Sequence, residues 1–224
     1  LREELRKANV DNATKQKVII QLNKKIDELK AALKEEEGKT NRNGMETYRA
    51  CGWKQYPRPQ MIRDNYLILD ENWKLNSHDI RMPFPPQSEL SGYKYIVGAH
   101  LTYETMFQIP DSFTKERILL HFGAVDQSAA VSVNDHVVGK HRGGYEPFCF
   151  DITDYLKEEN HITVVAADAL DSFVYPHGKQ CEKRGGMWYT PVSGIWKTVW
   201  MENVSSNYVE NIRIKPDEGG IDLV

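Results

Sequence analysis

The chain lacks a surplus of charge of either sign, a pair of closely spaced cysteines and a long apolar run. Its formal net charge is -3 over 224 residues, so no basic excess is available to neutralise phosphates, which argues against a nucleic-acid partner. No apolar run approaches the roughly 18 residues that a membrane-spanning helix needs, and no membrane span is predicted. The three cysteines are scattered without a CxxC pair. That pattern favours a reducing compartment, a cytoplasmic location and no disulfide framework.

Motifs for metals and cofactors are missing as well. The histidines are dispersed, and His136 and His141 would flank a strand rather than converge, so no metal site is expected. No nucleophile elbow, P-loop or dinucleotide fingerprint is present, and no cofactor is predicted. Asp168 and Asp171 stand three residues apart beside a serine, and turn chemistry explains them better than catalysis does. The two aspartates of FDITDYL are expected to end a strand and cap a helical turn.

Residues 1–44 differ in composition from the rest of the chain. Residues 1–39 contain no proline, and the stretch GKTNRNG that follows reads as a polar linker. The apolar positions step by three and four, as in a coiled-coil seam: Ile19, Leu22, Ile26, Leu29 and Leu33. This spacing predicts a helical arm. Two interpretations stay open: the arm makes a homo-oligomer, or it packs on its own domain or is foreign to it.

From about Leu67 onward, short apolar runs alternate with turn residues, which is typical of strands. Asn134-Asp135 lies between two β-branched runs and signals a hairpin turn, and the double glycines 143–144 and 185–186 mark loops. With almost no helical period after residue 45, the fold is predicted to be mainly β, an antiparallel sandwich or barrel. The strand candidates are Thr102 to Ile109, Arg117 to Phe122, Ala129 to Val133, His136 to Lys140, Phe148 to Asp151, His161 to Ala167, Ile195 to Val204 and Tyr208 to Lys215.

The stretch GGMWYTPVSGIWKTVW, residues 185–200, holds three of the five tryptophans. From Ile195 onward its side chains alternate with apolar residues on both faces, which predicts a strand covered on both sides. Trp196 and Trp200 share one of those faces and are assigned to the core. Gly185 to Pro191 has no such period and predicts a loop, so only this half is expected to touch a ligand.

Three stretches resemble the N-terminal region of glycoside hydrolase family 2. They are YPRPQMIRDNYLILDENWKL (56–75), LLHFGAVDQSAAVSVNDHVVGKHRGGYEPFCFDITDYL (119–156), and GKQ (178–180) followed by MWYTPVSGIWKTVWMENV (187–204). Family members include β-galactosidases, β-glucuronidases and β-mannosidases. The resemblance implies a sugar-binding domain over residues 45–207, with the fold of a galactose-binding-like jelly-roll β-sandwich. The segment LTYETMFQIP departs from the family pattern, because Glu104 and Thr105 stand where an arginine is usual.

The resemblance also implies what accompanies this domain. Residues 208–224 would open an immunoglobulin-like sandwich, and a catalytic TIM barrel would follow. The family's retaining mechanism uses two glutamates about 5 Å apart, which would lie on that barrel beyond Val224. We therefore expect no catalytic residue in this chain, no turnover by the chain alone, and a parent enzyme that hydrolyses O-glycosidic bonds of β-glycosides.

In the family, the loop before the SGIW strand lines the sugar site. This implicates Lys179 and Gln180 of GKQ, and Trp188 and Tyr189 of MWYT. The rings suit the C–H face of a sugar, and the lysine and glutamine offer donors and an acceptor to its hydroxyls. The alternative is that Trp188 plugs the end of the sandwich and Lys179 is merely solvated. Tyr145, after the double glycine 143–144, is assigned to the core.

Two other functions stay open at this point. The chain could be a stand-alone, lectin-like module, which predicts measurable sugar affinity without any enzyme. It could also be a scaffold whose helical arm drives oligomerisation. The sugar itself is not identified by these residues.

Overall fold

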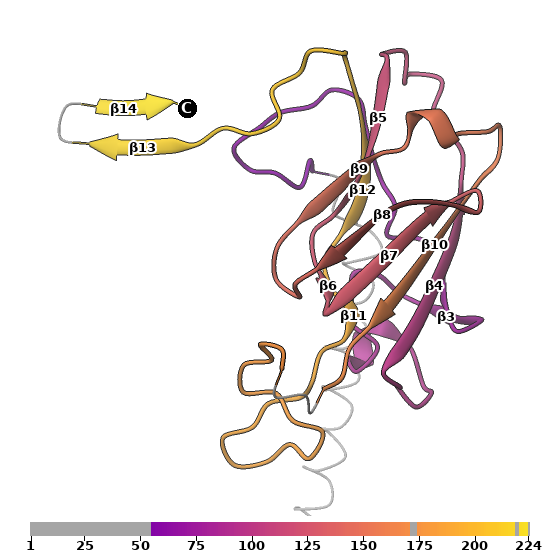
Figure 1. The fold of residues 1–224 in the computed structure, drawn as a ribbon, viewed down its shortest axis with the longest axis vertical. Coiled ribbons are helices and arrows are strands. Elements are labelled where there is room, and N and C mark those ends of the chain that lie inside the picture. Colours follow the sequence, from indigo (N-terminus) through magenta and orange to yellow (C-terminus); the bar gives the residue numbers. More distant parts are fainter. Residues whose placement is uncertain (1–54, 171–173, 218–219, 224) are drawn as a thin grey trace, which may run out of the picture. The chain divides into compact units, whose positions relative to one another are not determined.

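Short antiparallel strands, paired into sheets, form most of the regular secondary structure of the described residues (Figure 1). The computed structural model describes residues 55–170, 174–217 and 220–223. The predicted helical arm, residues 1–44, lies outside the described residues. Within them, the only helices are two single turns, Glu89–Ser91 and Thr153–Tyr155. Neither has the length and apolarity that crossing a membrane requires.

Two larger sheets and two small ones contain all the described strands. The four-stranded sheet has the order β1 (Tyr66–Ile68), β12 (Val199–Val204), β5 (Arg117–Phe122) and β9 (Phe148–Asp151). The six-stranded sheet has the order β3 (His78–Ile80), β2 (Trp73–Leu75), β4 (His100–Phe107), β10 (Asn160–Ala167), β7 (Ser128–Val133) and β8 (His136–Arg142). The small sheets pair β6 (Val125–Asp126) with β11 (Gly194–Ile195), and β13 (Ile214–Asp217) with β14 (Gly220–Leu223).

One hydrophobic core joins the two larger sheets. Along β4 and β10 every second side chain is buried, because successive residues of a strand point to opposite faces. The inward side chains of both sheets belong to a single cluster, which is the arrangement of a β-sandwich. Fully buried members of this cluster are Leu101, Tyr103, Ile162 and Val164 from the six-stranded sheet, and Leu120, Phe122 and Met201 from the four-stranded one. The prediction of a mainly β, antiparallel fold is confirmed.

Strand β12 is buried on both faces, as its apolar alternation predicted. Met201 lies in the core between the sheets. On the opposite face the Trp200 ring stacks on His121, with 4.8 Å between ring centroids and 5° between planes. Trp200 is therefore buried, as predicted, but it packs on the outer face of the sheet. The segment before β1 covers that face, where Tyr56 and Arg63 hydrogen-bond to Glu202.

Two of the predicted strands are wrong in part. The run Ile195 to Val204 is interrupted at residues 196–198, because Ile195 pairs with β6 while β12 pairs with β1 and β5. The run Tyr208 to Lys215 becomes a strand only at Ile214. Before that point the Glu210 carbonyl accepts a hydrogen bond from Arg58, and the Val209 carbonyl accepts one from Arg63. No described strand pairs with these residues.

The predicted turns are confirmed. Asn134 and Asp135, between β7 and β8, have φ angles of 49° and 69°, the left-handed pair that a two-residue hairpin turn requires. The Asn134 side chain donates to the Tyr155 carbonyl at 2.7 Å and accepts from the His161 N–H at 3.0 Å. Asp151 ends β9, as predicted, and accepts from the Thr153 N–H at 3.1 Å. The predicted cap is wrong, because Asp154 lies inside the helical turn Thr153–Tyr155, whose N-cap residue makes no side-chain cap hydrogen bond.

Candidate functional site

Three connections meet at one end of the sandwich: the β5–β7 connection, the β8–β9 connection and the long loop between β10 and β11. The Gly143 N–H donates to the Gln127 carbonyl at 2.8 Å, and the Gln127 N–H donates to the Ala167 carbonyl at 3.3 Å. The Trp196 indole N–H donates to the Gly144 carbonyl at 2.8 Å. These bonds tie segments that are distant in sequence into one surface.

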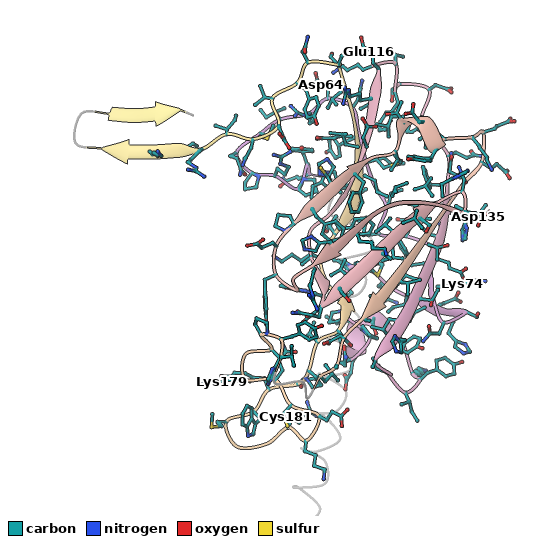
Figure 2. The ribbon with its side chains drawn as sticks, in the orientation of Figure 1. Asp64, Lys74, Glu116, Asp135, Lys179 and Cys181 are labelled. Carbon is teal, nitrogen blue, oxygen red and sulfur yellow. The ribbon has the colours of Figure 1, made fainter. Side chains whose placement is uncertain are left out.

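The β10–β11 loop carries all four residues implicated by the family resemblance, and Figure 2 labels Lys179 within it. Its two halves are joined by a hydrogen bond from the Tyr189 N–H to the Lys179 carbonyl at 2.8 Å, and by a bridge between Gln180 and Tyr189. The turn between them contains Gly186, whose φ of 59° favours glycine. The loop therefore has internal order, with its tip at the double glycine that the sequence marked.

The loop presents its aromatic residues to solvent. Trp188 is 42% exposed and Tyr189 is 66% exposed, and the neighbouring Lys179 is exposed as well. This exposure contradicts the alternative in which Trp188 plugs the end of the sandwich. Two large, partly exposed rings offer a surface on which a flat, partly apolar ligand can lie. Sugar binding by these residues stays a prediction.

Gln180 has a structural role that the sequence did not reveal. Its side-chain carbonyl oxygen accepts the Val192 N–H and so ties the start of the loop to its end. A second glutamine, Gln87, holds the next residue: the Ser193 N–H donates to Gln87 Oε1 at 3.2 Å, and Gln87 Nε2 donates to the Ser193 hydroxyl. The base of the loop is thereby fixed to the sandwich.

Two buried aspartates beneath this loop were missed by sequence reasoning. Asp126 ends β6 and Asp168 follows β10, and these residues are only 5% and 8% exposed. Burial raises the pKa of Asp126 to about 7, and the charge of Asp168 adds to the rise while His177 opposes it. Burial likewise raises the pKa of Asp168 to about 6, against His177. Asp168 was predicted to stabilise a turn, but the structure shows that it is buried beside the carboxyl group of Asp126.

The assignment of two aromatic residues to the core is wrong. Tyr145 is 47% exposed, and Trp196 is half-buried and lies outside the core cluster. Their rings meet edge to face with centroids 6.3 Å apart, and Lys197 Nζ lies 4.7 Å from the Trp196 ring centroid. Burial and the charge of Asp126 raise the pKa of the Tyr145 hydroxyl, which places this ring beside the aspartates. Strand periodicity failed for Trp196 because the strand is interrupted there.

Two glycines allow the close packing of this end. A Cβ on Gly144 would overlap the carboxylate of Asp126. Gly194, at the start of β11, has a φ of 70°, and a Cβ there would overlap the Tyr103 hydroxyl. In the sequence, the signals for these positions were the steps Gly143-Gly144 and Ser193-Gly194. Each of the two steps contains a glycine, 144 or 194, where no side chain fits.

The arrangement suits binding better than catalysis. Carboxylates accept hydrogen bonds from hydroxyl groups, and exposed rings pack against C–H groups. In the described part of the chain, no group of three or more histidine, cysteine, aspartate or glutamate side chains could hold a metal ion. These groups suit a ligand that has both hydroxyl groups and an apolar face.

The chain is similar to a family of known proteins and to several of its members. Residues 74–192, more than half of the chain, match the family described as glycosyl hydrolase 2 galactose-binding domain-like. A β-galactosidase of Thermoanaerobacter pseudethanolicus is 29% identical over 119 residues, which is 52% of this chain and 15% of that protein. A β-glucuronidase of Bacteroides fragilis is 34% identical over 125 residues, 49% of this chain and 18% of that protein.

A solved structure shows the same fold. The β-glucuronidase of Ruminococcus gnavus superposes with a TM-score of 0.54 and 18% identity, over 75% of this chain and 36% of that one. The chain thus spans less than a fifth of the two curated relatives above. Because the family match runs from β2 to the end of the β10–β11 loop, the chain belongs to the galactose-binding-like domains of glycosyl hydrolase family 2.

Proposed function

We propose that the chain is the non-catalytic N-terminal sugar-binding domain of a retaining β-glycosidase. The match of residues 74–192 to this family carries the proposal, and the names of the relatives, β-galactosidase and β-glucuronidase, support the reaction class. The parent enzyme would cleave O-glycosidic bonds through two carboxylates outside this chain. Which β-glycoside it cleaves depends on that catalytic part.

The loop residues are proposed to contact the sugar. Trp188 and Tyr189 present their rings to its C–H face, and Lys179 donates hydrogen bonds to its hydroxyls. Because the Gln180 carbonyl oxygen already accepts the Val192 N–H, this side chain positions the loop and offers mainly its amide donors. The exposure of the two rings supports these roles.

The family resemblance also supports a proposal for how the domains of the chain and of its parent protein are arranged along the sequence. Residues 45–207 would form the jelly-roll domain, residues 1–44 a helical arm able to oligomerise the chain, and residues 208–224 the first part of an immunoglobulin-like domain. A TIM barrel would supply the catalytic glutamates opposite the loop. The scattered cysteines support a cytoplasmic location.

A panel of nitrophenyl β-glycosides tests the reaction class. The chain alone is expected to release no nitrophenol, because both catalytic carboxylates lie elsewhere. A longer protein that contains the chain and a barrel domain is expected to turn over at least one substrate. Turnover by the chain alone would contradict the non-catalytic role, and turnover by neither would leave only a binding function.

The exposed rings also suit a second candidate, a stand-alone lectin-like module. The two candidates differ in the affinity of the chain for free glycosides. A domain that completes a pocket with a barrel is expected to bind with Kd values of about 1 mM or weaker, and a lectin-like module would reach about 1 μM to 100 μM. Calorimetric titration with the same glycosides separates them.

A further inference from the structure

Two arginines of the segment that precedes β1 connect the buried Glu202 to the chain that follows β12. Arg63 Nε lies 3.2 Å from Glu202 Oε2, and Arg63 Nη2 donates to the Val209 carbonyl at 2.6 Å. Arg58 Nη1 lies 3.9 Å from Glu202 Oε1, and Arg58 Nη2 donates to the Glu210 carbonyl. One buried carboxylate therefore reaches two consecutive backbone carbonyls, each through the guanidinium group of one arginine.

The carboxylate fixes the position of both arginines. The Glu202 side chain is fully buried in β12, which pairs with β1 on one side and with β5 on the other. Loss of its cationic partners would leave an uncompensated buried charge, which is strongly destabilising. Both guanidinium groups are therefore bound to this anchor, and each has N–H groups left for a second acceptor.

Residues 205–213, which we call the connector, lead from β12 to β13. No described strand pairs with the connector, and most of its side chains are exposed, that of Val209 among them. At its start the Ser206 N–H donates to the Glu116 carboxylate at 3.2 Å. Because strand pairing and burial contribute little here, hydrogen bonds to the main chain have the larger share in fixing its path.

We propose that Arg58 and Arg63 act as a clasp, through which the segment before β1 fixes the path of the connector on the sandwich. The two segments lie side by side, although 146 and 152 positions separate the residues that their hydrogen bonds join (Figure 1). The clasp is a positioning device and goes beyond the proposed sugar-binding function. Its consequence is a coupling: displacement of residues 58–63 from the sheet would release the connector, and with it the direction in which the chain enters β13.

Arginine suits this bridging role and lysine does not. The planar guanidinium group presents five N–H donors in a fixed fork, so one donor can face the carboxylate while another reaches a carbonyl. The lysine ammonium is a compact charge on a flexible stem, and it would stay beside Glu202 without holding the connector. Arg58→Lys and Arg63→Lys therefore keep the positive charges and remove the bridges.

The test measures backbone order parameters of the full chain by nitrogen-15 relaxation. In the unmodified chain, the amides of residues 208–211 are expected at about 0.85, the value of a rigid backbone. In the double variant Arg58→Lys/Arg63→Lys they are expected to fall below about 0.6, while the amides of β4 and β10 stay at about 0.85. Each single variant keeps one bridge, so it is expected to remain folded and to lie between these values.

Two matched controls separate bridging from a general loosening of the cluster around Glu202. Tyr56→Phe removes a hydrogen bond to Glu202 and leaves both guanidinium bridges in place. Arg81→Lys removes an arginine bond to a different backbone carbonyl, that of Leu90, at 3.0 Å. Both substitutions should leave the connector rigid.

A connector that stays rigid in the double variant, or that is already flexible in the unmodified chain, would overturn the clasp. Equal loosening by Tyr56→Phe would assign the effect to the cluster as a whole and would overturn the bridging role as well. Sugar affinity and glycosidase activity do not enter these measurements, so the proposed function stands or falls separately.

Discussion

Glu202 is a buried acid whose charged form is stabilised by the side chains around it. Its side chain is fully buried on the outer face of β12, where Tyr56 donates a hydrogen bond to it. Arg63 Nε lies 3.2 Å and His121 Nε2 lies 3.1 Å from its oxygens. Burial alone would raise the pKa of Glu202, but the hydrogen bonds from His121 and Tyr56 outweigh it and lower the value to about 2.

Replacing Glu202 by glutamine is expected to destabilise the fold by about 3 kcal/mol near neutral pH, because a buried charge cluster loses its only anion. Urea unfolding monitored by tryptophan fluorescence measures this loss. Glu104→Gln is the control: its side chain is 41% exposed with His161 at 3.8 Å, so a change within about 0.5 kcal/mol is expected. Equal effects of the two substitutions would refute the role given to Glu202.

At the scale of one element, β11 exists because residue 194 is glycine. Its φ is 70° and its Cα faces the Tyr103 hydroxyl, so alanine would be strained in its backbone and in its contacts. Gly194→Ala is expected to lower the free energy of unfolding by about 2–4 kcal/mol. Combining it with Tyr103→Phe should restore part of that loss, since the overlapping oxygen is gone.

Gly98→Ala serves as the control for this substitution, because nothing lies within 4 Å of a Cβ built at that position and its φ is not positive. A change within about 0.5 kcal/mol is expected there. Thermal unfolding followed by circular dichroism compares all four proteins. If Gly194→Ala is no more costly than the control, close packing against Tyr103 does not limit β11.

The strands that could be predicted from the sequence are those that form apolar runs of four or more residues between turn residues. Arg117–Phe122 and Phe148–Asp151 were predicted with their observed bounds. Strands β1, β2 and β3 were missed because three residues are too few to display alternation. Trp196 and Thr198 fit the alternation of the run although the backbone leaves the sheet there, and periodicity does not detect such a break.

At the scale of the whole molecule, the sequence located only half of the candidate site. Trp188 and Tyr189 were accessible to inference because they stand together in a motif, in a stretch without strand periodicity. Asp126 ends β6 and Asp168 follows β10, and these segments meet only in the folded sandwich, where the Gln127 N–H donates to the Ala167 carbonyl. Sequence reasoning that treats each acidic residue in its local turn therefore misses a pair that tertiary structure assembles.

Four buried acidic residues make the stability of the whole domain depend on pH. Folding raises the pKa values of Asp70, Asp126 and Asp168 from 3.8 to about 6, about 7 and about 6, chiefly through burial. For an acid whose folded pKa is raised, the stabilisation is complete below the unfolded value and is lost as the pH rises through the folded one. Folding lowers the pKa of Glu202 from 4.5 to about 2, so its contribution is complete above 4.5 and is lost toward acid.

These opposite shifts predict a stability maximum at about pH 4, because above that pH the losses from the three aspartates outweigh the gain from Glu202, and below it the contribution of Glu202 is lost. Urea midpoints measured from acid to mildly alkaline pH check this profile. Asp126→Asn and Asp168→Asn should flatten the alkaline limb, because they remove two of the carboxyl groups whose pKa values are raised by burial. Glu202→Gln should flatten the acid limb and leave the alkaline limb in place. Stability that instead rises steadily toward alkaline pH would contradict the raised pKa values of Asp126 and Asp168.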